Sequence, residues 1–163
     1  WMKTLHRTLF LGSTGSQIIG SATLLLIIEI ITGYCIWGKV AKARINSARH
    51  QGLGWWSGLK RSLRWRSPNM IMGCHTSGGF WSGIPLLLMA LTGLTWSFGW
   101  YGEMVFSVLD PDGKLNLFHS IANIHTGNFI APWSRLLWLI CAIIGATLPI
   151  TGYIIFFKSK SHK

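Results

Sequence analysis

The chain has 163 residues, half of them hydrophobic and only 12% charged, and its mean hydropathy is +0.40. These values exclude a soluble globular domain. A net charge of +11 would suit a nucleic-acid-binding protein, but the basic residues are distributed as in a membrane protein, so nucleic acid is excluded as a partner. We predict an all-α integral membrane protein in contact with membrane lipid.

Three apolar windows are each long enough to cross a hydrocarbon core of about 30 Å as an α-helix. They cover about 17–37, 79–100 and 133–157. The first contains Glu29 and is too long for the apolar region of a signal peptide. We expect one transmembrane domain over residues 1–163, within a bundle of four or more helices that absent sequence or another chain completes.

Basic residues gather on one side of the predicted membrane. Eight of the fifteen lysines and arginines lie in the loop 39–76, and three follow the last window, which is the positive-inside pattern. The loop is therefore cytoplasmic, residues 1–16 and the loop 102–130 are external, and the C-terminus is cytoplasmic. Tryptophans among these basic residues suggest a segment on the anionic inner leaflet or, alternatively, a docking face for an electron donor. They are Trp55, Trp56 and Trp65.

The first and third windows belong to an internal repeat. A shift of 125 − 6 = 119 residues superposes His6 on His125. The same shift superposes the Thr-Gly-Tyr at 32–34 on that at 151–153, and such a gap-free match implies duplicated structural units. The second window contains a related Thr-Gly pair at 92–93. These pairs let a neighbouring helix or a flat macrocycle approach the backbone, and plain helix packing explains them equally well.

Three histidines are candidate ligands of haem iron. Neutral imidazole is a good axial ligand, and a low-spin haem that carries electrons takes one from each face. On the predicted topology His6 and His125 lie at the same depth on the outer side, so the repeat would build one bis-histidine site. His75 lies at the cytoplasmic end of the second window. The alternative for each histidine is an interfacial side chain without a ligand.

Two further residues compete for a role. His119 precedes His125 by six residues, about 240° around a helix, so the two cannot bind one face of an iron; only His125 has a counterpart in the repeat. Glu29 is acidic inside a span, where a charge costs at least about 2 kcal/mol. It fits a proton relay or a haem edge, or a neutral acid bonded to a backbone carbonyl. The cysteines form no CxxC pair, which argues against a zinc cluster or covalently attached haem.

Four motifs carry a family resemblance. They are WMKTLHRTLFLG at 1–12, the arginine-rich loop that leads to His75 and Trp81, LTGLTWSF at 91–98 and IHTGNF at 124–129. They resemble the PepSY-associated transmembrane proteins of bacterial inner membranes, which include haem-containing reductases of ferric siderophores. The resemblance implies two b-type haems and electron transfer from a cytoplasmic or membrane donor to a periplasmic acceptor. It also implies that His6, His75 and His125 occupy the positions of family histidines.

Two features usual in that family are missing from this sequence. Family members usually have an additional first helix, which opens with a Leu-His-Arg-Trp-like motif at the cytoplasmic face, and then a periplasmic PepSY domain. Because the sequence begins with Trp1, we expect either a portion of a longer polypeptide or a further chain that supplies both parts. His75 would then share an inner haem with a histidine from outside this sequence.

The leading functional hypothesis is a haem-b membrane electron-transfer protein, most concretely a reductase of a ferric siderophore or its membrane part. The iron would perform the redox chemistry, while the protein supplies axial ligands and an apolar cavity. One alternative is a structural or regulatory membrane subunit without a cofactor. Another is a transporter, which the repeat and Glu29 suggest, although three helices are few for a substrate pathway.

Overall fold

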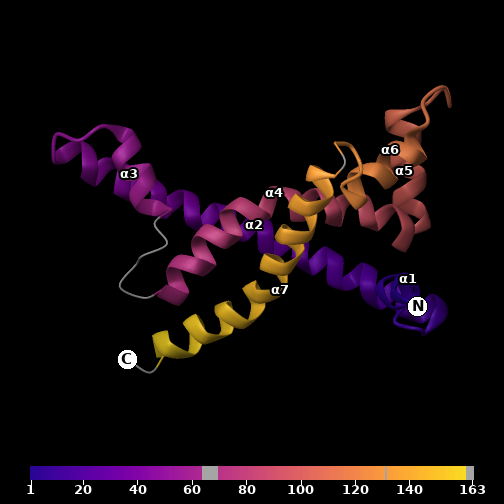
Figure 1. Ribbon diagram of the computed structural model, residues 1–163, viewed down its shortest axis with the longest axis horizontal. Helices are drawn as coiled ribbons and strands as arrows, with labels where there is room; N and C mark the ends of the chain where they lie inside the picture. The colour runs from indigo at the N-terminus through magenta and orange to yellow at the C-terminus, as the bar shows by residue number, and fades with distance from the viewer. Residues whose placement is uncertain (64–69, 131, 161–163) are drawn as a thin grey trace. The chain divides into compact units, whose positions relative to one another are not determined.

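The computed structural model describes residues 1–63, 70–130 and 132–160 (Figure 1). Within these ranges all regular structure is helical, which confirms the predicted all-α class. Trp65 lies outside the described residues. The helices are α1 (Met2–Thr8), α2 (Gly12–His50), α3 (Trp55–Ser62), α4 (Met70–Ser97), α5 (Gly99–Leu109), α6 (Leu117–Thr126) and α7 (Trp133–Lys160).

Three of the described helices are long and apolar enough to span a membrane, namely α2, α4 and α7. The protein is therefore a multi-pass membrane protein, and each predicted window overlaps one of these helices. Large apolar side chains along them are exposed and suited to a lipid environment. Examples are Leu25, Ile28, Ile36, Leu137, Ile143 and Ile150.

The segment 39–76, for which a cytoplasmic loop between two spans is predicted, contains the end of α2, all of α3 and the start of α4. Helix α2 continues to His50 because residues 38–50 are rich in alanine, lysine and arginine, which favour helix even though they are not apolar. It ends before Gly52, whose φ is +72°. Helix α3 then packs against α2, where a Cβ on Gly58 would lie 2.4 Å from the Ile45 Cα. Only glycine permits that approach.

The expected boundaries of the second window also need correction. Helix α4 begins at Met70, so His75 lies in its second turn rather than ahead of the helix. The small and apolar residues from 70 to 78 continue the helical pattern. At the other end α4 stops at Ser97, because the extended backbone of Phe98 separates it from α5.

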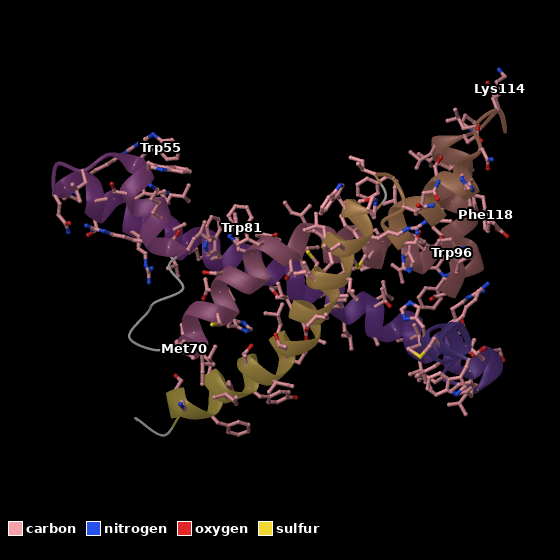
Figure 2. The ribbon with its side chains drawn as sticks, in the orientation of Figure 1. Trp55, Met70, Trp81, Trp96, Lys114 and Phe118 are labelled. Carbon is pink, nitrogen blue, oxygen red and sulfur yellow. The ribbon has the colours of Figure 1, made fainter. Side chains whose placement is uncertain are left out.

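The segment 102–130, for which an external location is predicted, contains most of α5 and all of α6. A tight turn joins these two helices, and the Asp110 carboxylate accepts hydrogen bonds from the backbone N–H groups of Lys114 and Leu115 at 2.8 and 3.0 Å. Carboxylate acceptors of this kind stabilise turns. The rings of Trp96 and Phe118 lie edge to face, 6.2 Å apart (Figure 2). The segment that joins the second and third spans therefore contains two helices.

The chain forms two compact units. Unit 1 comprises Trp1–Glu29 and Pro85–Leu139, and unit 2 comprises Ile30–Ile84 and Ile140–Lys163. Helices α2, α4 and α7 each contribute one part to each unit. Within α4 the division falls at Pro85, which has no backbone N–H and so interrupts the helical hydrogen-bond ladder.

The two predicted repeats share the same order of elements. In each, a short helix carries a histidine in its last turn, namely His6 in α1 and His125 in α6. A left-handed residue ends each short helix, with φ of +50° at Leu9 and +71° at Gly127. A long apolar helix follows in both cases. The repeat thus places one histidine just ahead of α2 and the other just ahead of α7.

Candidate functional site

Unit 1 brings His6 and His125 together. Their ring centroids are 6.1 Å apart, and the ring planes are inclined by 44°. His6 is exposed and His125 is half-buried. The two imidazoles come from α1 and α6, the equivalent short helices of the repeat, so each is held by a helix end followed by a turn of fixed geometry.

Helix α4 orients the His125 ring through two hydrogen-bonding groups. The Nδ1 atom of His125 lies 2.9 Å from the Met89 carbonyl oxygen and 3.1 Å from the Thr92 Oγ1. The Thr92 hydroxyl donates its own hydrogen to the Leu88 carbonyl at 2.6 Å, so its lone pair can accept from His125. Both neighbours therefore favour a proton on Nδ1, which leaves the Nε2 lone pair available as a metal ligand.

Gly93 and Trp96 complete the surroundings of the His125 ring. A Cβ on Gly93 would lie 3.1 Å from the His125 Cε1, so the absent side chain is what lets the ring edge lie against α4. The Trp96 ring contacts His125 edge to face with centroids 5.2 Å apart. The imidazole is thus fixed by a hydrogen bond at Nδ1, by backbone at Cε1 and by an indole.

Burial lowers the pKa of His125 below its usual value. The Met89 carbonyl, which favours the protonated ring, raises the pKa by less than burial lowers it, and the nearby His6 lowers it further. His125 is therefore neutral at pH 7, and only a neutral imidazole can bind a metal through Nε2.

Unit 2 repeats this arrangement around His75. The Nδ1 atom of His75 lies 2.8 Å from the Thr151 Oγ1, and Thr151 also hydrogen bonds to the carbonyl of Thr147 at 3.1 Å. A Cβ on Gly152 would lie 3.4 Å from the His75 Cε1. We call such an arrangement a Thr-Gly site, in which the threonine Oγ1 faces the imidazole Nδ1 and the next glycine lies against its Cε1.

The sequence did not predict these two Thr-Gly sites. From sequence, the Thr-Gly pairs fit the close approach of a neighbouring helix or of a flat macrocycle, and nothing connects them with particular histidines. The sequence did hold one signal. The second and third windows contain one Thr-Gly pair each, and one candidate histidine is available for each pair. In the structure Thr92 and Gly93 hold His125, while Thr151 and Gly152 hold His75.

The ring contact between His6 and His125 does not include the other predicted site residues. His119 is exposed on α6 and is not part of the contact between His6 and His125. Glu29 is an exposed residue of α2. The cysteines are not paired with one another; they are Cys35, Cys74 and Cys141.

The described residues contain no group of three or more histidine, cysteine, aspartate or glutamate side chains that could hold a metal ion. A hollow of about 310 Å³ is lined by Lys3, Thr4, Arg7 and Thr8 of α1. Its two cationic side chains lie on the helix that carries His6.

The family model of the PepSY-associated TM region matches residues 1–116. The chain belongs to this family. None of the curated proteins and no solved structure matches the chain. The PepSY-associated match includes His6, His75 and the Thr-Gly pair at 92–93, whereas His125 and the pair at 151–152 lie beyond it. His125 is therefore connected with the matched residues only through the repeat, in which it is the counterpart of His6.

Proposed function

We propose that this protein is a haem-b membrane electron-transfer protein. It holds an outer haem between His6 and His125 and passes electrons from the cytoplasmic side to a periplasmic acceptor, most concretely a ferric siderophore. The structure carries no ligand, so the proposal rests on the fit of the two imidazoles to such a group and, for the acceptor, on the resemblance to haem-containing reductases.

The distance between the two rings is the observation that carries the proposal. An imidazole nitrogen lies about 2.0 Å from a first-row metal and the ring centre roughly 1.1 Å further, so two axial imidazoles have centroids roughly 6.2 Å apart. The centroids of His6 and His125 are 6.1 Å apart. The Nδ1 partners of His125 leave its Nε2 available, as a haem ligand requires.

The remaining residues have separable tasks. Haem supplies reversible one-electron chemistry when it is bound. Met89 and Thr92 fix the orientation of the His125 ring, and Gly93 gives it room against α4. Lys3 and Arg7 line a hollow on α1, the helix that also carries His6, and would offer positive charge to the two carboxylates that haem b carries.

The direction of transfer follows from charge. Lysines and arginines of the α2 end and of α3 favour a cytoplasmic location for that region by the positive-inside rule, and the predicted topology then makes the His6 and His125 pair periplasmic. His75 lies in the opposite half of α4 and is held by its own Thr-Gly site, as a ligand of a second, inner haem would be.

Absorption spectroscopy of the protein purified from membranes tests the proposal. We expect reduced-minus-oxidised bands of bis-imidazole haem b, and we expect His6→Ala and His125→Ala each to lower the same spectral component about tenfold or more. His119→Ala is the matched control and should leave that component intact. A visible region without features, or bands that survive both histidine replacements, would contradict the proposal.

The acceptor needs its own measurement. Protein reduced under anaerobic conditions should be reoxidised on addition of a ferric siderophore, with ferrous iron trapped by a chromogenic chelator. His6→Ala should abolish this reoxidation, whereas His119→Ala should not. A haem that stays reduced in the presence of ferric siderophores would exclude them as acceptors while leaving the haem assignment in place.

A further inference from the structure

The end of α2 and helix α3 form an antiparallel hairpin within unit 2. The Leu53 N–H donates to the Ala48 carbonyl at 2.9 Å, and further along α3 Gly58 lies against Ile45 of α2 (Figure 1). Later residues of α3 therefore lie beside earlier residues of α2. We call residues 39–63 the basic hairpin.

Polar contacts hold the two arms of the basic hairpin together. The Arg44 guanidinium of α2 donates to the Arg61 carbonyl of α3, and the Arg61 guanidinium donates to the Gln51 Oε1 at 3.1 Å. At the base of the hairpin, the buried Ser77 hydroxyl of α4 donates to the Leu63 carbonyl at 2.8 Å. The hairpin is therefore fastened both across its arms and to α4.

On the predicted topology the tip of the basic hairpin lies beyond the lipid headgroups. The apolar window 17–37 is about 31 Å long as a helix, which matches a hydrocarbon core of about 30 Å and leaves little room for tilt. Ala48, near the tip, follows Trp37 by 48 − 37 = 11 residues, which is about 16 Å along α2. The headgroup region of one leaflet is only about 5–7 Å thick. A position in the cytoplasm therefore fits the hairpin better than one on the inner leaflet.

Two exposed tryptophans lie at the tip of the basic hairpin. Trp55 is 56% exposed and Trp56 is 53% exposed, and their rings meet edge to face with centroids 5.4 Å apart (Trp55 in Figure 2). Gly58 and Ser62 form the buried face of α3. Trp56 is about 160° around the helix from Gly58 and so faces away from α2, with the Lys60 ammonium over its ring at 5.7 Å. Large apolar side chains exposed in this way mark an interaction surface.

The charge of the basic hairpin is not balanced by acidic residues nearby in the sequence. The chain has no aspartate or glutamate from 30 to 102. The lysines and arginines of the hairpin are all exposed, namely Lys39, Lys42, Arg44, Arg49, Lys60 and Arg61. Cations around a pair of exposed tryptophans are complementary to an acidic protein surface, because tryptophan and arginine contribute most strongly at protein interfaces and opposite charges steer the encounter.

We propose that the basic hairpin is the docking surface for a soluble electron-carrier protein with an acidic face. Trp55 and Trp56 contact the carrier, and the surrounding cations steer it. Ser77, which fastens the hairpin to α4, follows His75 by two residues, so a docked carrier lies at the cytoplasmic end of the electron path. The identity of the partner as an electron carrier rests on the proposed function. In each encounter the carrier is oxidised by one electron and this protein is reduced by one electron, so no further reactant is needed.

Binding measurements test the docking surface without reference to haem. The protein purified from membranes is placed in phosphatidylcholine nanodiscs, and the probes are an oxidised flavodoxin and an oxidised plant-type ferredoxin, each chosen for an acidic surface. We expect at least one of them to bind, with an affinity that falls as salt rises. Trp56→Ala and Lys60→Glu should each weaken this binding about tenfold.

The matched controls change the same residue types elsewhere in the chain. Trp100→Ala removes an exposed tryptophan of α5, and Lys158→Glu reverses an exposed lysine near the end of α7. Neither should change the Kd by more than about twofold, because exposed charges far from a contact are screened. Arg61 is left intact, since its guanidinium and carbonyl hold the arms of the hairpin together.

A fluorescent reporter at Gly54 separates the possible partners. Gly54 has a φ of −66° and open space at its Cβ position, so Gly54→Cys can carry an environment-sensitive bimane in a background without the native cysteines. We expect the emission to shift to the blue when the carrier is added. No shift is expected when phosphatidylglycerol replaces phosphatidylcholine, or when single-stranded RNA is added.

Four results would overturn the proposal. They are a blue shift with phosphatidylglycerol alone, a blue shift with RNA alone, the absence of binding by either carrier, and equal affinities of wild type and Trp56→Ala. The first would make α3 a lipid-surface helix, and the second would make the hairpin a nucleic-acid site.

Electron transfer is a separate readout. The reduced carrier should reduce the holoprotein, and Trp56→Ala should slow this step about tenfold at limiting carrier. Haem content, measured from the dithionite-reduced spectrum, tells slower docking from loss of haem. A protein without haem that still binds the carrier through the hairpin would refute the proposed function and leave the docking surface in place, so the two failures can be told apart.

Discussion

A threonine hydroxyl can bond to its own helix and still hold an imidazole from another helix. Thr92 and Thr151 each donate to a carbonyl of the preceding turn, which directs a lone pair toward the imidazole Nδ1 of His125 or His75. Because a hydroxyl is both donor and acceptor, one side chain satisfies the helix and fixes the ring. The following glycine then removes the only obstacle at the ring edge.

Replacement of Thr92 tests this arrangement in unit 1. Thr92→Val keeps the shape and removes the oxygen, so His125 retains only the Met89 carbonyl at Nδ1. We expect about tenfold weaker haem retention in the outer component, measured by titrating purified apoprotein with haem. Thr92→Ser should restore retention. Thr23→Val is the control and should match wild type, because the Thr23 hydroxyl donates to the Ile19 carbonyl within its own helix. Equal affinities for Thr92→Val and Thr92→Ser would show that the hydroxyl has no part in holding the ring.

The two glycines differ in how much room they leave. A Cβ at Gly93 would lie 3.1 Å from its imidazole, but at Gly152 the distance is 3.4 Å, which is ordinary van der Waals contact. Gly93→Ala should therefore displace His125 and lower outer haem occupancy by about tenfold, while Gly152→Ala has a smaller effect on the His75 site. Haem-to-protein ratios measure both. Gly38→Ala, with open space around it, should change neither ratio.

At the scale of the element, the turn between α6 and α7 sets where His125 points. Gly127 has a φ of +71°, and a Cβ there would lie 2.8 Å from the Trp138 ring. The Ser134 hydroxyl donates to the Gly127 carbonyl at 2.6 Å and accepts from the Ile130 N–H at 2.9 Å. The Ser134 hydroxyl thus holds both ends of the turn, from Gly127 to Ile130. His125 lies two residues before Gly127.

Gly127→Ala should destabilise the protein by more than a left-handed backbone alone explains. A left-handed alanine costs about 1 kcal/mol, and contact with Trp138 adds to that cost. Gly113→Ala is the matched control, since Gly113 has a φ of +65° but open space at its Cβ position, so only the backbone cost applies. Thermal unfolding in detergent measures both variants. Equal melting temperatures for the two would mean that the turn relaxes around the new methyl group.

The sequence predicted the spans better than their ends. Apolar length alone identified α2, α4 and α7, but residues 38–50 are polar and helix-favouring, so hydropathy could not show that α2 continues through them. The repeat predicted that His6 and His125 face one another, because residues at equivalent positions of duplicated structural units occupy equivalent places in the fold. The two Thr-Gly sites were not predicted, since plain helix packing also explains Thr-Gly pairs and matching each pair with a histidine requires the side-chain geometry.

At the scale of the whole molecule, charge sets the orientation in the membrane. The basic residues of the α2 end and of α3 are expected in the cytoplasm by the positive-inside rule, and on the predicted topology the segment with α5 and α6 is external. Ser47 and Ser107 are exposed in these two regions and provide a matched pair of reporter positions.

Cysteine labelling checks this orientation. In a background with Cys35, Cys74 and Cys141 replaced, Ser107→Cys should react with a membrane-impermeant maleimide in intact spheroplasts. Ser47→Cys should react at least about tenfold less until the membrane is opened, because the bilayer core excludes the charged reagent. The reverse pattern would invert the direction of electron transfer that we propose.

The cationic hollow on α1 bears on encounters in solution. Lys3 and Arg7 lie one turn apart on α1 and line the same hollow, so their electric fields add. If the proposed function holds, an anionic iron chelate would be attracted within roughly 10 Å at 0.1 M ionic strength, and its association rate would fall as salt rises. A neutral chelate gains nothing from this field. The charge on the incoming complex, and not only its shape, would then decide which iron sources are collected fastest from dilute surroundings.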